Sequence, residues 1–339
     1  MRKAFVLSVS LLLLGGCLVD KGPETLRVSG KTMGTTYNVT VVDAPEGTTE
    51  AGLLDRIETV LTDVNGKLSN WDPNSEVSLF NASQSTDAVT ISASFAQVMD
   101  AANDVHALSG GKFDVTLAPL IELWGFGPKR PGEPIPSDED ITAALEAVGQ
   151  SSLLALDGTS LRKLRPDVSV NLSAIAKGFG VDQIAAALKA DGIDRYLVEI
   201  GGDLVTSGFN GDNEPWSIGI ERPDAASRTV EEILHLTDKG LATSGDYRNY
   251  FEEDGVRYSH IIDPTTGKPI THRTASTTVI ADNAMTADAM ATALLVVGRD
   301  AAFDIADKAG IAVLAIERVD GQFETSTSPA FDALMGDQD

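Results

Sequence analysis

Four segments of this sequence combine glycine with Asp, Ser, Thr or His between apolar runs, and such segments can bind anions and metal ions. In a loop, these residues supply tight turns, donors for phosphate oxygens and hard oxygen ligands for a divalent cation. The same composition is also typical of ordinary surface turns, so each segment needs support from its spacing. The segments are residues 111–127, 171–178, 243–264 and 287–292.

Asp288 and Thr292 carry the signal for a metal site. They are four residues apart, so on a helix their oxygen atoms lie on one face, one turn apart. A carboxylate and a hydroxyl are hard ligands that suit Mg²⁺ when it shares its shell with phosphate oxygens and water. A helix whose Thr292 bonds its own backbone, with Asp288 in the first turn, would explain the same pattern. The spacing by itself leaves both explanations open.

Lys177 and His260 are the other side chains suited to chemistry. Lys177 follows a polar turn and opens a predicted helix, so its ammonium and free backbone N–H groups could bind an anion together. The glycine spacing of a Walker motif is missing, and a capped surface helix with a solvated lysine explains this segment equally well. His260 ends a strand-like run near acidic residues, and a histidine can accept a proton near neutral pH. The other histidines are predicted to be structural or are uninformative: His106, His235 and His272.

Apolar periodicity and turn residues place these groups between helices and strands. The predicted helices are Glu50–Leu68, Phe95–Leu108, Ile141–Val148, Ile175–Lys189, Thr286–Val297 and Ala301–Ala309. The predicted strands are Thr35–Val42, Tyr196–Ile200, Trp216–Ile220, Val230–Leu236, Tyr258–Ile262, Thr277–Ile280 and Ile311–Ile316. Residues 127–138 are rich in Pro and Gly and are predicted to be a loop. The mixture indicates an α+β or mixed α/β fold with most helices packed against sheets.

The N-terminus has the pattern of a bacterial export signal with a lipid attachment site. Two basic residues precede the apolar run Ala4–Leu14, which is shorter than the roughly 20 residues that span a bilayer. The following Gly-Gly-Cys17 resembles the lipobox of bacterial lipoproteins, in which the cysteine is acylated and becomes the new N-terminus. We expect a signal peptide at residues 1–16, a lipidated cysteine and linker at 17–26, and a folded domain at 27–335. Cys17 is the only cysteine in the sequence, so disulfides and thiolate catalysis are excluded for that domain.

The formal net charge of −24 argues against nucleic acid as a partner, because backbone phosphates select basic surfaces. A small phosphate ligand is still possible, since the Debye length at physiological salt is about 8 Å and local donors or a cation decide such binding. Hydrophobic residues make up 42% of the sequence, which predicts a substantial core.

In series, these segments resemble the ApbE family, the FAD:protein FMN transferases, and the resemblance covers nearly the whole mature chain. Its motifs are Lys31–Tyr37, Leu68–Trp71 leading to Ser75-Glu76, Phe113–Thr116 with Trp124–Gly127, Ala174–Gly178, Gly201–Asp203, Ser244–Tyr247, His260–Pro264 and Ala287–Ala289. One such motif could arise by chance, but the ordered series is typical of the family. The resemblance implies an α+β fold with mixed, mainly antiparallel sheets and packed helices.

The resemblance also implies a reaction and a set of site residues. The reaction splits the FAD pyrophosphate with Mg²⁺, attaches FMN by a phosphoester to a Thr or Ser of another protein, and releases AMP. The implied metal ligands are Asp288, Thr292 and the carbonyl of Ala174. The implied FAD contacts are Met33, Trp71, Lys112, Phe113, Asp114, Asn171, Lys177 and Ile262. The implied base is His260. We expect Asp246 or Asp263 to orient it, and the sequence leaves open which.

Two positions depart from the usual family pattern. Trp71 stands where the family often has Tyr, which keeps an aromatic ring for stacking. Asn171 stands where Asp is common, which keeps an acceptor oxygen but removes its charge.

Two other functions remain open at this point. A Mg²⁺-dependent FAD pyrophosphatase, which releases FMN and AMP, would use the same residues. A non-catalytic FAD-binding lipoprotein is disfavoured, because storage needs neither a base at His260 nor metal ligands at Asp288 and Thr292. For the transferase, the resemblance points to acceptors among membrane-bound electron-transfer subunits of Nqr type (sodium-pumping quinone reductases) or Rnf type. We expect the protein at the cell membrane, anchored by lipid and facing the periplasm.

Overall fold

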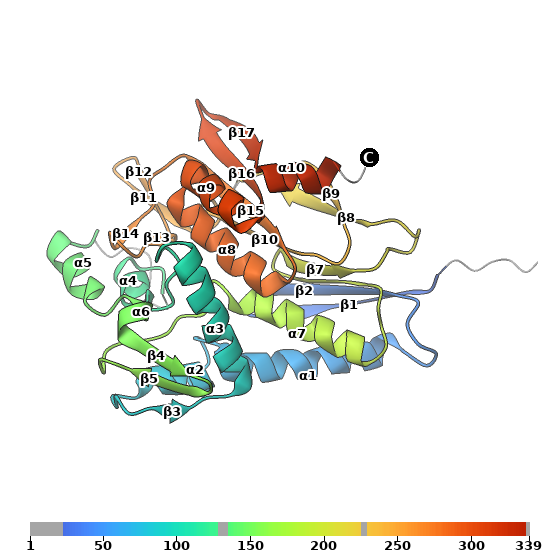
Figure 1. Cartoon of the computed structure of the whole chain (residues 1–339), viewed down its shortest axis with the longest axis horizontal. Coiled ribbons are helices and arrows are strands. Elements are labelled where there is room, and N and C mark those ends of the chain that lie inside the picture. Colours follow the sequence, from blue (N-terminus) through green and yellow to red (C-terminus); the bar gives the residue numbers. More distant parts are fainter. Residues whose placement is uncertain (1–22, 128–134, 225–228, 337–339) are drawn as a thin grey trace, which may run out of the picture.

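The computed structural model describes residues 23–127, 135–224 and 229–336, and its main element is an eight-stranded sheet. The strands of this sheet are β1 (Thr25–Thr32), β2 (Thr35–Val42), β6 (Tyr196–Ile200), β7 (Asp203–Ser207), β10 (Gly240–Gly245), β15 (Thr274–Ala281), β16 (Ala312–Val319) and β17 (Gln322–Thr327). They lie in the order β1-β2-β6-β7-β10-β15-β16-β17, and all neighbouring pairs are antiparallel (Figure 1). The predicted α+β class with mainly antiparallel sheets is confirmed. β1 includes residues 25 and 26, which were predicted to be linker.

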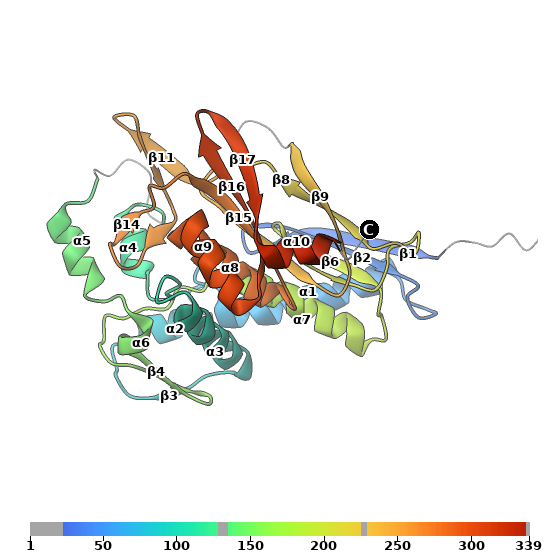
Figure 2. The ribbon, with the colours of Figure 1, turned by 45° about the horizontal axis from the view of Figure 1, so that its top comes forward.

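Helices cover one face of this sheet. The long helices on that face are α1 (Glu50–Leu68), α7 (Ala176–Ala190) and α8 (Ala284–Val297), and α9 (Arg299–Ala309) packs beside α8. Figures 1 and 2 show α7 between α1 and α8 on the sheet, and α7 contacts both of the others. Alternate residues of β2 point toward these helices and are buried there: Tyr37, Val39 and Val41.

The helices α7 and α8 cross at close range because Gly178 has no side chain. A Cβ atom at Gly178 would lie 2.3 Å from the carbonyl oxygen of Ala284. One turn further along α7, Asp182 accepts hydrogen bonds from the backbone N–H groups of Ala284 and Met285, each at 2.9 Å. These contacts fix the beginning of α8 against α7 and so determine where the later residues of α8 lie.

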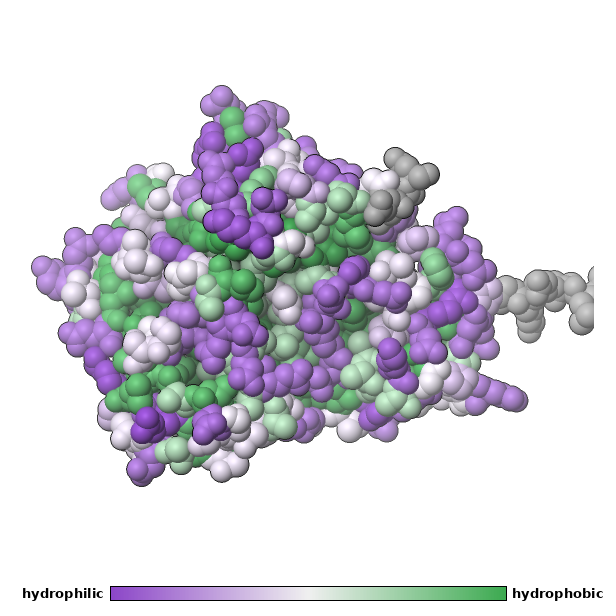
Figure 3. Space-filling view, viewed as in Figure 1, coloured by the Kyte–Doolittle hydropathy of each residue, from purple (hydrophilic) through white to green (hydrophobic). Residues whose placement is uncertain are grey.

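A hairpin and a helix cover the opposite face of the sheet. They are β8 (Trp216–Glu221), β9 (Val230–Leu236) and the C-terminal α10 (Pro329–Gly336). Their buried residues pack with the sheet residues that face away from α7 and α8: Trp216, Leu234 and Phe331 with Leu204, Leu314 and Ile316. Hydrophilic residues dominate the projecting β16–β17 hairpin at the top of the space-filling view (Figure 3).

A smaller layer lies beside α1 and α8. Its elements are α2 (Glu76–Ala82), β3 (Val89–Thr90), α3 (Ala93–Leu108), α4 (Ala118–Leu123), α5 (Asp138–Leu145), α6 (Gln150–Leu153), β4 (Leu154–Asp157) and β5 (Ser160–Lys163). The three strands form a sheet in the order β3-β5-β4, and α3 packs against α8. The predicted loop at 127–138 includes residues 128–134, which lie outside the described residues, and α5 begins at its last residue.

Residues 246–273 leave the main sheet between β10 and β15, and we call this segment the arm. It holds two small hairpins, β11 (Tyr250–Glu253) with β12 (Val256–Ser259) and β13 (Ile262–Asp263) with β14 (Lys268–Pro269). A continuous strand at Tyr258–Ile262 was therefore a wrong prediction. The strand breaks because the chain changes partner after His260. The backbone N–H of His260 still bonds the Asn249 carbonyl in the register of β11–β12, at 3.1 Å, whereas the carbonyl of Ile261 already accepts from Ile270 in the register of β13–β14, at 2.9 Å.

The N-terminal anchor lies outside the described residues. This applies to Cys17 and to the predicted signal peptide at residues 1–16. Within the described ranges, none of the helices has both the length and the apolar composition that a membrane crossing requires.

Candidate functional site

Two adjoining pockets contain the residues implied by the sequence. The larger one has a volume of about 370 Å³ and lies between α8, the start of α7, β10, the α3–α4 loop and the arm. It is lined by ten of the implied residues: Lys112, Phe113, Asp114, Asn171, Ala174, Lys177, His260, Ile262, Asp288 and Thr292. The smaller pocket, of about 110 Å³, is lined by the other two, Met33 and Trp71. Lys177 and Ser173 line both pockets, so the two form one continuous region.

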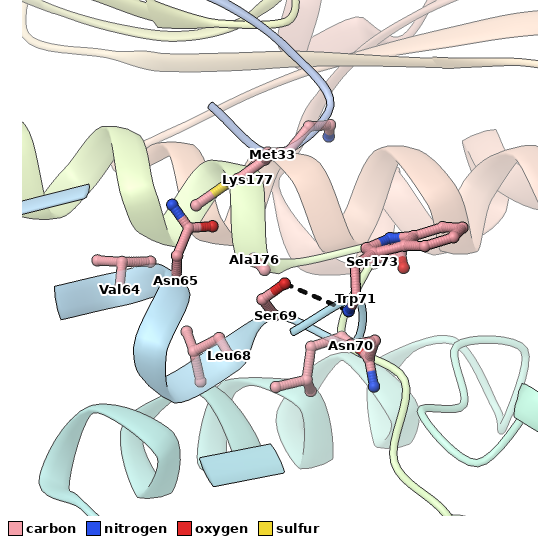
Figure 4. Close-up of a pocket in the computed structure, with 11 residues that line it drawn as sticks. Met33, Val64, Asn65, Leu68, Ser69, Asn70, Trp71, Ser173, Ala176 and Lys177 are labelled. Atoms are coloured by element: carbon pink, nitrogen blue, oxygen red, sulfur yellow. Dashed lines mark hydrogen bonds between the residues drawn. The ribbon is translucent and has the colours of Figure 1, made fainter. Parts of the chain in front are cut away.

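The smaller pocket presents an aromatic ring and a thioether (Figure 4). Met33 lies in the two-residue turn between β1 and β2, where it and Gly34 have φ angles of 49° and 75°. That turn places Met33 beside Gly180 of α7. Trp71 follows α1, and its backbone N–H donates to Ser69 Oγ at 3.3 Å. The Trp71 side chain is 68% exposed, so its ring is available to a planar ligand.

Asp288 and Thr292 lie on the pocket side of α8, as their spacing predicted. The carboxylate of Asp288 is buried and accepts hydrogen bonds from Lys177 Nζ at 3.1 Å and from the backbone N–H of Gly178 at 3.0 Å. The hydroxyl of Thr292 lies 2.9 Å from the hydroxyl of Ser244 on β10. The helix therefore directs a carboxylate and a hydroxyl into one wall of the larger pocket.

Lys177 joins two buried carboxylates at the start of α7. Its ammonium donates to Asp203 as well as to Asp288. Burial by itself would lower the pKa of Lys177, but the two carboxylates outweigh it and hold this pKa above its ordinary value. Burial and the charge of Asp288 raise the pKa of Asp203, against the lowering effect of Lys177. With both acids ionised, the cluster carries one more negative charge than positive charge, so a bound cation would balance it.

The oxygen donors of this wall fit Mg²⁺. Ala174, Asp288 and Thr292 bring a carbonyl, a carboxylate and a hydroxyl to the same pocket. Ala174 lies just before α7, whose N-cap is Ile175, and the amide of Gly178 in the first turn donates to Asp288. All three are hard oxygens, which Mg²⁺ prefers together with water and phosphate. The described residues hold no cluster of three or more His, Cys, Asp or Glu side chains suited to a metal.

His260 faces the same pocket from the arm. Its Nδ1 lies 3.0 Å from the carbonyl oxygen of Asn249, so Nδ1 carries the hydrogen and Nε2 is left as an acceptor. Burial lowers the pKa of His260 below 6.5, against the raising effects of the Asn249 carbonyl and the Asp246 charge. The imidazole is therefore neutral at pH 7 and can take up a proton.

Asp246 and Asp263 were the predicted orienting acids, and this prediction is wrong. Asp246 binds Arg318 through both of its oxygens, at 2.6 and 2.9 Å. Asp263 binds Lys112 Nζ through both of its oxygens, at 2.8 Å each. Among the contacts of the described residues, the backbone carbonyl of Asn249 orients the ring of His260 instead.

The α3–α4 loop contributes three implied FAD contacts, and their polar groups are largely engaged within the protein. The carboxylate of Asp114 accepts from Thr116 and from the backbone N–H of Gln150 at 2.9 Å. The carbonyl of Phe113 accepts from His106 Nδ1 at 2.7 Å, which gives His106 the structural role predicted for it. Lys112 reaches across the pocket wall to Asp263, as described above. The loop thus forms a rigid wall of the pocket.

Asn171 and Ile262 complete the wall. The side-chain oxygen of Asn171 accepts from the backbone N–H of Ser173 at 3.0 Å, which shapes the turn before α7. Ile262 is buried in an apolar cluster with Leu120 and Trp124. Asp203 and the Asn249 carbonyl are site groups that the sequence analysis missed. Asp203 belonged to a recognised Gly-Gly-Asp turn, but the turn does not reveal that it pairs with Lys177.

Comparison with known proteins places this arrangement in one family. The family model described as the ApbE family matches residues 33–315. The FAD:protein FMN transferase of Vibrio cholerae serotype O1 is 43% identical over 335 residues, which cover 99% of each chain. That of Haemophilus influenzae is 42% identical over 97% of this chain and 96% of its own.

A solved structure has the same fold. The flavin transferase ApbE from Vibrio cholerae superposes with a TM-score of 0.85 at 41% identity. The match covers 92% of this chain and 99% of that protein. The likeness therefore includes the sheet, the helices and the segments that line both pockets.

Proposed function

The chain belongs to the ApbE family and is a FAD:protein FMN transferase, and from this premise we propose how it carries out the transfer. It cleaves the pyrophosphate of FAD in a Mg²⁺-dependent reaction and attaches FMN to a Thr or Ser hydroxyl of an acceptor protein. AMP leaves. The observation that carries the proposal is the placement of a neutral histidine, a charged lysine and an oxygen-donor wall around one pocket.

His260 is the base in this proposal. The hydroxyl oxygen of the acceptor attacks the phosphorus of the FMN half and forms the new P–O ester bond. The P–O bond to the AMP half breaks, and AMP leaves with the bridging oxygen. The hydroxyl proton passes to Nε2 of His260, the nitrogen that the Asn249 carbonyl leaves free. From there it passes to the departing phosphate or to water, which restores the neutral ring.

The ammonium of Lys177, at the N-terminus of α7, binds the negatively charged pyrophosphate in this proposal. The ammonium is held between Asp203 and Asp288, so its position is fixed before the ligand arrives. Ala174, Asp288 and Thr292 would hold the Mg²⁺ ion. Bound there, it would neutralise charge on the pyrophosphate oxygens as a Lewis acid. The exposed ring of Trp71 and the side chain of Met33 offer a place for the flavin in the smaller pocket.

One experiment tests the reaction. Purified protein is incubated with FAD, Mg²⁺ and a candidate acceptor, and is assayed for in-gel flavin fluorescence, free FMN and AMP. We expect a fluorescent acceptor band and AMP in equal amounts, and loss of both in His260→Asn and without Mg²⁺. Replacing the acceptor Thr or Ser by Ala should remove the band. Free FMN without a labelled acceptor would show a pyrophosphatase instead, and unchanged FAD would show binding alone.

The acceptor and the location belong to the same proposal. The export signal pattern and the Gly-Gly-Cys17 sequence support a protein anchored by lipid in the cell membrane and facing the periplasm. Acceptors within reach of such an anchor are membrane-bound electron-transfer subunits, of which the Nqr and Rnf types are our candidates. The net charge of −24 supports a protein acceptor rather than nucleic acid.

A further inference from the structure

The arm that carries His260 and Ile262 is not part of the main sheet, so other contacts must hold it in place. At the base of the arm, Arg318 donates two hydrogen bonds to the carboxylate of Asp246. Its far hairpin is held by the indole N–H of Trp124, which donates to the Gly267 carbonyl at 2.8 Å. Between these two points, Arg248 donates to Glu221 at 2.5 Å, and Asp263, next to Ile262 in the sequence, accepts from Lys112.

The ammonium group of Lys112 makes three hydrogen bonds to the arm. Nζ lies 2.8 Å from each carboxylate oxygen of Asp263 and 2.9 Å from Thr265 Oγ1. An ammonium has three N–H donors, so these three acceptors occupy it. The side chains of Lys112 and Asp263 are 26% and 21% exposed, so the pair is better shielded from water than a surface ion pair.

The α3–α4 loop, which carries Lys112, is fixed by hydrogen bonds of its own. Ser109 Oγ accepts from the backbone N–H of Phe113 at 3.0 Å, and His106 donates to the Phe113 carbonyl. The neighbouring Asp114 is bonded to Thr116 and Gln150. Lys112 therefore extends from a fixed loop toward a segment that lies outside the main sheet.

We propose that the Lys112–Asp263 pair positions the arm, and that Lys112 is a positioning residue for His260 and Ile262 rather than a direct contact of FAD. The proposal rests on the transferase function given above. Asp263 is one residue from Ile262 and three from His260, so a shift at Asp263 displaces both. Displacing a catalytic group by about 1 Å costs on the order of 100-fold in rate.

Two single variants and their double mutant test the pair. In Lys112→Met and Asp263→Asn we expect kcat of transfer to fall about 10- to 100-fold, while the dissociation constant of FAD rises by a smaller factor that is the same in both variants. The double mutant should be no slower than either single variant, because each removes the same interaction. Lys112→Arg should restore most of the rate.

A neighbouring ion pair supplies the matched control. Lys268 of the arm binds Asp138 at 2.7 Å, and these side chains are 52% and 82% exposed. Lys268→Met removes the same charge from an exposed pair and should leave kcat within about twofold of wild type.

Amide hydrogen exchange of the arm gives a readout that is independent of activity. The N–H of Ile270 bonds the carbonyl of Ile261 within the arm, and its exchange should become faster in Lys112→Met and Asp263→Asn but not in Lys268→Met. This comparison remains valid even if the protein transfers no flavin. The proposal is overturned if Asp263→Asn keeps wild-type kcat and exchange while Lys112→Met weakens FAD binding tenfold, since Lys112 would then bind FAD directly.

Discussion

A backbone carbonyl orients the ring of His260, and the burial of that ring sets its pKa. The Asn249 carbonyl fixes the hydrogen on Nδ1, and burial disfavours a second proton on the ring. An imidazole held in this way works as a base in its neutral form. The pH dependence of transfer should therefore report this pKa directly.

We predict that transfer persists as the pH falls through 6.5 and is lost in more acidic solution. The base must be unprotonated, and the pKa of His260 lies below 6.5, so the neutral form survives below the ordinary value. The check is kcat/KM for FAD from pH 5 to 8 with a saturating acceptor and a parallel test of folding at each pH. A midpoint above pH 7 would contradict this placement of the base.

For Asp288, we predict that Asp288→Asn raises the Mg²⁺ concentration for half-maximal transfer at least about tenfold, because it removes the one charged ligand of the proposed site. Lys177 keeps Asp203 as a partner, so the fold should remain intact by circular dichroism. Asp282→Asn is the control, since it removes a charge from a side chain that is 90% exposed. An unchanged Mg²⁺ titration in Asp288→Asn would exclude it as a ligand.

Some site residues were predictable from sequence and others were not. Asp288 and Thr292 have a spacing that a helix converts into a shared face, so local geometry was enough. Asp203 pairs with Lys177, 26 residues away, and only the packing of β7 beside α7 brings them together. The carbonyl of Asn249 has no signature at all, because every residue has a carbonyl group.

At the scale of elements, the amphipathic segments were the predictable ones. The bounds of α1, β2, β6 and β9 agree with the predicted ones. In α1, β2 and β6 the apolar residues repeat at the period of the element itself. β10 was missed because its sequence, GLATSG, has small residues in place of an apolar alternation. It is stabilised by its two neighbours in the sheet, which single-segment periodicity does not show.

The α7–α8 crossing gives a prediction at this scale. Gly178→Ala should destabilise the fold by about 1–3 kcal/mol, because the new methyl group would meet the Ala284 carbonyl. Gly66→Ala on α1 is the matched control: a Cβ there meets nothing within 4 Å, so the change should stabilise by up to about 1 kcal/mol. Urea denaturation of both variants measures the difference. Equal effects would mean that α7 and α8 do not cross this closely.

At the scale of the whole molecule, the proposed anchor can be separated from the chemistry. Cys17→Ser should abolish lipid attachment, detected by mass spectrometry, and move the protein from the membrane fraction to the soluble fraction. The transfer rate on a soluble acceptor fragment should stay within about twofold of wild type, because the described residues that line both pockets begin at Met33. Retention of Cys17→Ser in the membrane fraction would argue against the lipid.

The spread of the larger pocket along the chain has a consequence for when the protein becomes active. Its lining begins at Lys112 and ends at Val296, and α8 is among the last elements to be synthesised. A nascent chain that lacks α8 has neither Asp288 nor Thr292, however well its first strands have folded. Flavin chemistry therefore cannot start before synthesis has passed Thr292, which makes it a property of a nearly complete chain.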